Sequence, residues 1–237
     1  MIDINQHKFF LVQILKDIYT DIELSNILGF KGGTALMLFY DLPRFSVDLD
    51  FNLLEAEKNN IVFAKVRKIL LRHGTIFDEA KKFYGLLIVM DYGLNERKLK
   101  VEISNRRFED SYEIKNFLGI NMKVMVQEDM FAHKLCALLD RNVLANRDIF
   151  DCWFFMQCQT PVNKDIVEAR MQMPLSGYIQ NCIENLESTS DKTLLQGMGE
   201  LMDDKMKRFV KVKMRPELIS LLKFYKEYPI LKSGNKT

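Results

Sequence analysis

Several features that would mark a membrane-bound or secreted protein are missing from this sequence of 237 residues. No run approaches the roughly 18 to 20 apolar residues needed to cross a bilayer. The first ten residues, MIDINQHKFF, are acidic and polar where a secretory signal would be basic and then apolar. We therefore expect a soluble, cytoplasmic protein with no membrane partner.

Cysteine and histidine are also scarce. The four cysteines form no Cys-x-x-Cys pair and lie mostly in apolar stretches of helical spacing, which is typical of buried thiols and not of a disulfide framework or a zinc site. The three histidines have no spacing that suggests a metal site. We expect packing or surface roles for all of these residues: Cys136, Cys152, Cys158, Cys182, His7, His73 and His133.

The remaining composition is that of a folded protein, with 48% hydrophobic and 28% charged residues. The net charge of +2 hides an asymmetry, because residues 205–237 carry ten Lys or Arg and two Asp or Glu. Such a segment can attract RNA phosphates or an acidic partner, or it can be an ordinary solvated helix face. Aromatic residues among these charges can stack on bases or face a core: Phe209, Phe224, Tyr225 and Tyr228.

Hydrophobic periodicity divides the chain into two parts. The first mixes helical patterns at 7–28, 35–40 and 58–72 with strand patterns at 45–51, 86–92 and 99–104. After about residue 126 only helical patterns follow, at 127–141, 146–157, 163–172, 176–187, 191–212 and 216–227. We predict an α/β fold of the α+β type, with an α/β domain over 1–125 that holds a small mixed sheet and a helical domain over 126–237.

Two carboxylates stand out within the predicted strand at 45–51. Side chains two residues apart in a strand point to the same face, so Asp48 and Asp50 lie about 7 Å apart at their Cα atoms. Two such oxygen donors suit Mg²⁺, which completes its shell with water and substrate phosphate. Nearby, Gly32-Gly33-Thr34 predicts a turn into a helix, whose free amides can hold a phosphate.

A third carboxylate, Glu102, lies on the strand predicted at 99–104. It alternates with Val101 and Ile103, so it can add a metal ligand from a neighbouring strand or be an exposed residue of the sheet face. An Asp-x-Asp strand and a Gly-Gly turn are each common, but their combination within about 20 residues predicts a metal and triphosphate site.

Three segments resemble a known family. Residues 31–51, KGGTALMLFYDLPRFSVDLDF, are similar to the signature of the AbiEii/AbiGii toxin family of nucleotidyltransferases, a branch of the polymerase-beta-like superfamily. Residues 127–138, QEDMFAHKLCAL, resemble the lysine-bearing helix of that family, and residues 146–151, NRDIFD, resemble its Arg-Asp motif. The resemblance covers roughly residues 7–160 and implies a nucleotidyltransferase sheet followed by a helical lobe.

The resemblance also implies roles for particular residues. Asp48 and Asp50 would bind Mg²⁺ together with the NTP, and Lys134 and Asp148 would be catalytic residues from the helical part. Lys134 can instead extend from a core edge, Asp148 can cap a helix, and Asp151 can take the role of Asp148. The nucleotide-binding residues would be Gly32, Gly33, Thr34, Arg44 and Ser46, of which Arg44 and Ser46 can also simply hold the turn before the strand.

The leading hypothesis is a Mg²⁺-dependent nucleotidyltransferase that moves NMP from an NTP to an acceptor hydroxyl and releases pyrophosphate. The resemblance adds that it would be the toxin of a type IV toxin–antitoxin or abortive-infection system, that the acceptor would be RNA at a tRNA 3′ end, and that an antitoxin would be a partner. The alternatives are transfer to a protein acceptor, a nucleotide-binding regulator with little turnover, and an RNA-binding adaptor that uses the basic tail.

Overall fold

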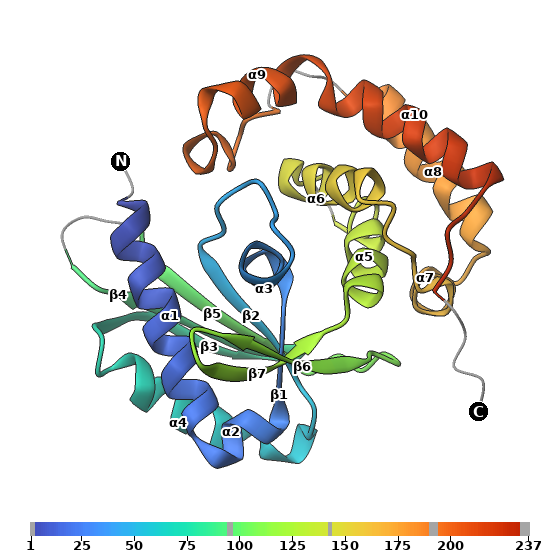
Figure 1. The fold of residues 1–237 in the computed structure, drawn as a ribbon. Helices are drawn as coiled ribbons and strands as arrows, with labels where there is room; N and C mark the ends of the chain where they lie inside the picture. The colour runs from blue at the N-terminus through green and yellow to red at the C-terminus, as the bar shows by residue number, and fades with distance from the viewer. Residues whose placement is uncertain (1–2, 94–96, 142–143, 190–193, 233–237) are drawn as a thin grey trace. The chain divides into compact units, whose positions relative to one another are not determined.

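The computed structural model describes residues 3–93, 97–141, 144–189 and 194–232. The chain forms two compact units, residues 1–125 and residues 126–237, which we call the sheet unit and the helical unit. The sheet unit contains a seven-stranded mixed sheet with helices, and the helical unit is built almost wholly of helices (Figure 1). The predicted α/β fold is confirmed.

The sheet unit begins with two helices, alternates strands and helices up to residue 70, and ends with five consecutive strands. Its elements are α1 (Ile4–Thr20), α2 (Ile22–Ile27), β1 (Leu28–Lys31), α3 (Gly32–Phe39), β2 (Asp48–Leu53), the 3₁₀ helix η1 (Ala56–Lys58), α4 (Asn59–Leu70), β3 (Thr75–Lys82), β4 (Gly85–Asp91), β5 (Leu99–Ser104), β6 (Tyr112–Phe117) and β7 (Ile120–Met125).

Strand β2 lies in the middle of the sheet, whose strand order is β3-β4-β5-β2-β1-β7-β6. It runs antiparallel to β1 and parallel to β5. In this register Asp50 is opposite Lys31 of β1 on one side and Glu102 of β5 on the other. The centre of the sheet therefore carries Asp48, Asp50 and Glu102, the metal ligands predicted from the sequence.

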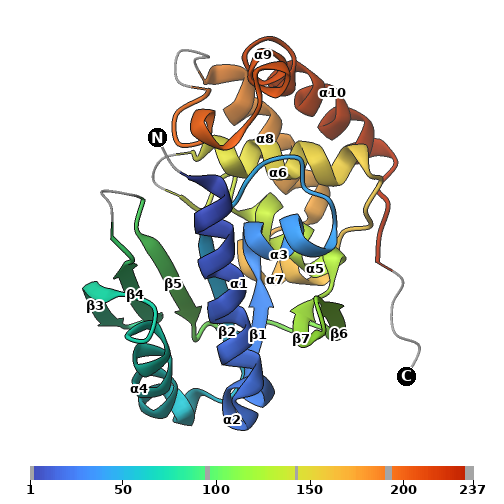
Figure 2. The same cartoon turned by 60° about the vertical axis from the view of Figure 1, so that its left-hand side comes forward.

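The hydrophobic core explains which way β2 presents its acidic residues. Leu49 and Phe51 are fully buried, and the ring of Phe51 lies 6.4 Å from that of Tyr19 in α1. Because neighbouring strand residues point to opposite faces, Asp48 and Asp50 point away from the α1 side. Helix α4 covers β3 and β4 farther along the sheet (Figure 2).

In the helical unit, α10 packs against α6, α8 and α9, and α5 packs against α6 and α7. The rings of Phe131 and Phe155 stack in its core with centroids 5.0 Å apart. The elements are α5 (Gln127–Cys136), α6 (Asn146–Gln157), α7 (Lys164–Met171), α8 (Leu175–Ser188), the 3₁₀ helix η3 (Gly199–Leu201), α9 (Asp204–Val212) and α10 (Met214–Glu227).

The single opening helix predicted over 7–28 is wrong. Asp21 starts a second helix, because its carboxylate accepts the N–H groups of Glu23 and Leu24 at 3.0 Å each. The predicted helix also runs one residue too far, since α2 ends at Ile27 and Leu28 pairs with Leu53 between β1 and β2.

The strand predicted over 45–51 begins only at Asp48, where its pairing with Lys100 of β5 starts. Four strands were missed. Strand β3, for example, is an edge strand with mostly exposed residues and shows no apolar alternation. Of the helix predicted over 191–212, residues 204–212 are α-helical, and residues 191–193 lie outside the described residues.

Two expectations based on missing features can be compared with the structure. Within the described ranges, no helix is both long and apolar enough to span a membrane. All four cysteines are free thiols; Cys136, Cys152 and Cys182 are buried as predicted, whereas Cys158, just after α6, is exposed.

Candidate active site

The turn between β1 and α3 brings the backbone close to Asp50. Gly32 has a φ of +81°, a conformation that residues with a Cβ rarely adopt, and a Cβ placed there would lie 2.5 Å from Oδ2 of Asp50. Lys31, in the N-cap position of α3, makes no capping hydrogen bond through its side chain. The first amides of α3 therefore lack a side-chain cap and suit an anion.

Arg44 and Ser46 pack on the second glycine of the turn. A Cβ placed on Gly33 would lie 2.7 Å from Oγ of Ser46 and 3.0 Å from Nη2 of Arg44. Both side chains are buried, and Nη1 of Arg44 also donates to the carbonyl of Phe45 at 3.3 Å. The fold thus brings Arg44 and Ser46 against the start of α3.

The hydroxyl of Thr34 has a partner within the protein. It is fully buried and donates to the main-chain carbonyl of Asp48 at 2.5 Å. This bond joins the first turn of α3 to the start of β2. The hydroxyl therefore holds these two segments together. The predicted contact of Thr34 with a phosphate would have to use its main-chain amide.

Asp48 and Asp50 form the acidic centre of the sheet unit, and both are partly buried. Burial raises the pKa of Asp50, and the negative charges of Asp48 and Glu102 raise it further; Lys100 and Lys31 lower it, but they do not cancel the shift. Ionisation of Asp50 is therefore less favourable in the folded protein than in water, and a cation bound beside it would stabilise this carboxylate.

The donor set on this face fits a magnesium ion. In the part of the chain that the structure describes, no three Asp, Glu, His or Cys side chains are gathered to hold a metal. Glu102 is instead 3.2 Å from Lys100, which also lies 3.4 Å from Asp48. Mg²⁺ is usually held by one or two carboxylates plus water and substrate phosphates, so Asp48 and Asp50 fit it as a pair. Glu102 as a third ligand stays a prediction.

We expect Gly32→Ala to lower the rate of nucleotidyl transfer by about 100-fold, because the new Cβ must displace Asp50 or the turn. Gly119→Ala is the matched control: Gly119 has the same φ of +81°, and in the described structure no atom lies within 4 Å of a Cβ placed there. Both variants should lose about 1 kcal/mol of stability from backbone strain. Equal transfer rates in the two variants would contradict the role given to the turn.

The helical unit carries a second ionic cluster, centred on Lys134 of α5. Its Nζ lies 3.0 Å from Oδ1 of Asp148 and 2.7 Å from Oδ2 of Asp151, and Nε of Arg141 lies 2.7 Å from Oδ2 of Asp148. Both aspartates are fully buried, whereas the Lys134 side chain is 16% exposed. Asp148 and Asp151 thus share one lysine and belong to one ionic cluster, and the choice of Asp148 as the catalytic carboxylate stays a prediction.

Three residues next to the predicted ones did not emerge from the sequence patterns. Asn52 continues the acidic face of β2 and donates to Asp110 and Tyr112 at 2.8 Å each. Strand alternation could have identified Asn52 and Lys100, since each lies two residues from a predicted metal ligand and therefore on the same face of its strand. Arg141 has no such signal, because its contact depends on the path of the chain after α5.

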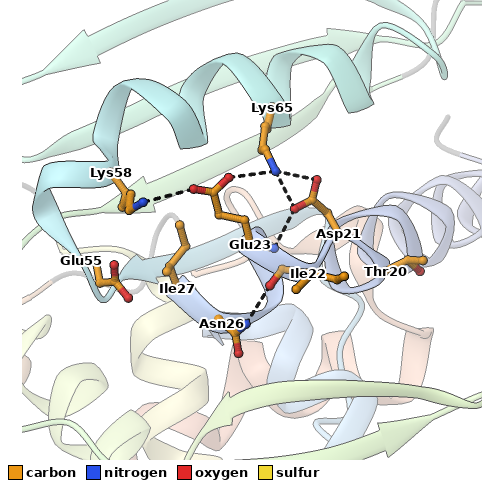
Figure 3. A pocket seen from close by; sticks show the side chains of 9 residues that line it. All are labelled: Thr20, Asp21, Ile22, Glu23, Asn26, Ile27, Glu55, Lys58 and Lys65. Atoms are coloured by element: carbon orange, nitrogen blue, oxygen red, sulfur yellow. Dashed lines mark hydrogen bonds and ion pairs between the residues drawn. The ribbon is translucent and has the colours of Figure 1, made fainter.

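A pocket of about 550 Å³ lies at the other end of β1 from Asp50 (Figure 3). Lys65 binds Asp21 at 2.9 Å and Glu23 at 3.0 Å, and Lys58 binds Glu23 at 3.3 Å. The charged groups at its centre therefore satisfy one another. None of the predicted site residues lines it: the lining residues are Thr20, Asp21, Ile22, Glu23, Asn26, Ile27, Glu55, Lys58 and Lys65.

One family model matches most of the chain. It is described as the nucleotidyl transferase AbiEii toxin of type IV toxin–antitoxin systems, and the match spans residues 13–211. The chain belongs to the AbiEii family. The AbiEii match contains the glycine turn, the Asp-x-Asp strand, Lys134 and Asp148, and it confirms the resemblance seen in the sequence.

Solved structures share the fold of this AbiEii protein. A candidate nucleotidyltransferase from H. pylori has a TM-score of 0.63 at 22% identity, with 94% of each chain covered. The protein JHP933 from Helicobacter pylori has a TM-score of 0.62 at 22% identity, covering 95% of this chain and 92% of its own. An antigenic nucleotidyltransferase-like protein from Paracoccidioides brasiliensis has a TM-score of 0.50 at 15% identity, covering 90% and 93%. No curated protein matches the chain.

AbiEii membership determines the class of activity. The chain is a nucleotidyltransferase toxin of a type IV toxin–antitoxin family, so an NTP is its substrate and an antitoxin is the expected partner. Nucleotidyltransferases generally use a divalent metal ion, which agrees with the paired carboxylates of β2.

Proposed function

We propose that this protein transfers NMP from an NTP to a hydroxyl at the 3′ end of an RNA, with tRNA as the acceptor class, in a Mg²⁺-dependent reaction that releases pyrophosphate. The observation that carries the proposal is the acidic face of β2 lying directly against the uncapped start of α3. Carboxylates for a metal ion and amides for a phosphate thus meet within one short segment.

Asp48 and Asp50 would hold the metal ion, with Glu102 as a further candidate ligand. When bound, Mg²⁺ would neutralise triphosphate charge and polarise the phosphorus that is attacked. The amides after Gly32 and Gly33 would bind phosphate oxygens without side-chain bulk. Electrostatic stabilisation and positioning provide most of the catalysis in phosphoryl transfers.

Arg44 and Ser46 would contact the same phosphates from the segment before β2. Both are buried against Gly33, so their side chains are held in place before a nucleotide arrives. Thr34 would act mainly through its amide, because its hydroxyl bonds Asp48.

Lys134 and Asp148 would be the contribution of the helical unit. The acceptor oxygen forms a bond to the α-phosphorus, the bond from that phosphorus to pyrophosphate breaks, and the hydroxyl proton must be removed. Asp148 would accept this proton or orient the hydroxyl, and Lys134 would place a positive charge on the phosphates. Because Asp151 shares Lys134 with Asp148, it would help to hold that lysine in position.

The proposal is tested by incubating the protein with labelled NTPs, Mg²⁺ and total RNA. We expect label to appear on RNA, in a 3′-terminal fragment of tRNA, and the transfer to stop when EDTA removes the metal. Label on protein and not on RNA would contradict the RNA acceptor. Transfer that continues in EDTA would contradict the metal requirement.

The physiological part of the proposal is that this activity is the toxic half of an abortive-infection pair. Expression of the protein should arrest growth of a bacterial host, and an antitoxin encoded in the adjoining reading frame should relieve the arrest. Growth arrest that persists in the Asp50→Ala variant would separate toxicity from nucleotidyl transfer.

A further inference from the structure

Helix α9 presents an unusually cationic face. Lys205, Arg208 and Lys211 are exposed and recur every three residues, which places them on one side of the helix. The exposed Lys213 follows directly after the helix. In the described part of the chain these four cations have no ion-pair partner, whereas the neighbouring Lys207 pairs with Asp204 at 3.0 Å.

The opposite face of α9 is already used within the helical unit. Val210 is fully buried, and the ring of Phe209 packs on Trp153 of α6 with centroids 4.5 Å apart. An amphipathic helix that binds a membrane needs a free apolar face to enter the acyl region. Because α9 buries its apolar face against the protein, its cations suit the phosphates of a nucleic acid better than a lipid surface.

Helix α10 adds two exposed aromatic rings to the same unit. Phe224 and Tyr228 are 63% and 68% exposed, and their rings lie 5.3 Å apart. The other aromatics of the basic segment face the core, since Tyr225 is only 5% exposed and Phe209 packs on Trp153. The structure thus separates the packing aromatics from the two that remain open to a partner.

Exposed residues connect these two features. Lys213, directly before α10, is exposed, and so are Ser220 and Phe224, which lie four residues apart on one side of α10. Helix α10 follows Lys213 directly and packs against α9, so the cations and the aromatic pair lie on two adjoining helices (Figure 1). Cations that follow a backbone, combined with rings on which bases stack, are the usual means of binding single-stranded nucleic acid.

We propose that this surface, formed by Lys205, Arg208, Lys211, Lys213, Phe224 and Tyr228, binds a single-stranded segment of the RNA acceptor. The cations contact its phosphates and the two rings stack on its bases. The inference rests on the proposed RNA-directed function and adds the surface that recognises the acceptor. It assigns a role to four of the ten cations of residues 205–237, which the chemistry at Asp48 and Asp50 does not use.

The first test measures binding of a fluorescein-labelled single-stranded RNA without NTP, so that no transfer takes place. We expect Lys205→Ala/Lys211→Ala to weaken binding about tenfold at 0.1 M salt and to lower the slope of log K against log salt by about 1.4. Lys8→Ala/Lys16→Ala, which removes two exposed lysines from α1, is the matched control and should bind as the wild type does. Equal binding by the two double variants would overturn the proposal.

The second test separates stacking from charge. Phe224→Ala/Tyr228→Ala should weaken binding about fivefold or more while leaving the salt slope unchanged. Phe83→Ala/Tyr84→Ala, which removes another exposed aromatic pair, should have no effect. Unchanged affinity in the α10 variant, or binding of the wild type to anionic vesicles but not to RNA, would overturn the proposed surface.

These binding measurements do not depend on the transfer reaction. If RNA receives no label in the transfer assay but its binding depends on α9 and α10, the proposed function fails and the surface stands. If RNA is labelled, and the variants bind RNA and label it as the wild type does, the surface fails and the proposed function stands.

Discussion

Replacing Asp50 with alanine is expected to reduce nucleotidyl transfer by at least about three orders of magnitude, because one of the two carboxylates that hold the metal ion and its triphosphate is lost. The variant should fold normally, since Asp50 lies on the polar face of β2 and not in the core. The transfer rate is measured with labelled NTP, and folding by circular dichroism.

Asp78→Ala is the matched control for this prediction. Asp78 is an exposed aspartate on the edge strand β3 of the same sheet, so its loss should leave the transfer rate unchanged. Substantial activity in Asp50→Ala, or an equal loss in Asp78→Ala, would remove the basis for the metal assignment.

The raised pKa of Asp50 also predicts how Asp50→Asn changes the melting temperature of the metal-free protein. A carboxyl whose pKa is higher in the folded than in the unfolded state favours folding at low pH, and this contribution is lost as the pH rises through the folded pKa. Above that pH the uncharged asparagine should therefore raise the melting temperature by a few degrees while the variant stays inactive. A lower melting temperature than that of the wild type would contradict the assigned electrostatics.

Lys134→Ala is expected to have the largest effect on stability, about 3 to 5 kcal/mol in the helical unit, because it removes the lysine that two fully buried carboxylates share. Transfer should be severely reduced as well. Urea unfolding followed by tryptophan fluorescence measures the first effect, since Trp153, the single tryptophan of the chain, lies in α6, the helix that carries Asp148 and Asp151.

A double variant separates the catalytic role of Lys134 from its structural one. Lys134→Met/Asp151→Asn removes one charge of each sign and keeps the pair of Asp148 with Arg141, so most of the lost stability should return. If Lys134 acts on phosphate, this stable double variant should remain inactive. Recovery of full transfer would make the cluster purely structural.

The sequence predicted the bounds of an element correctly where that element has its own apolar periodicity. The predicted helix at 146–157 and the strand at 99–104 occur with those bounds as α6 and β5, because each has its own apolar period. The pairing of Asp48 with Asp50 on one face likewise follows from strand geometry. The sequence analysis missed strands β1 and β6, because β1 is only four residues long and β6 has no buried residue.

By itself, the sequence determined the class of fold, the acidic pair of β2, the glycine turn and the basic charge of the last 33 residues. Only the tertiary structure decided that the hydroxyl of Thr34 bonds β2, that Lys100 lies between Asp48 and Glu102, and that Arg141 joins the cluster around Lys134. It also decided which aromatics of the basic segment are exposed. The reason is physical: periodicity shows which face a side chain takes on its own element, whereas its partners depend on which distant elements pack against that face.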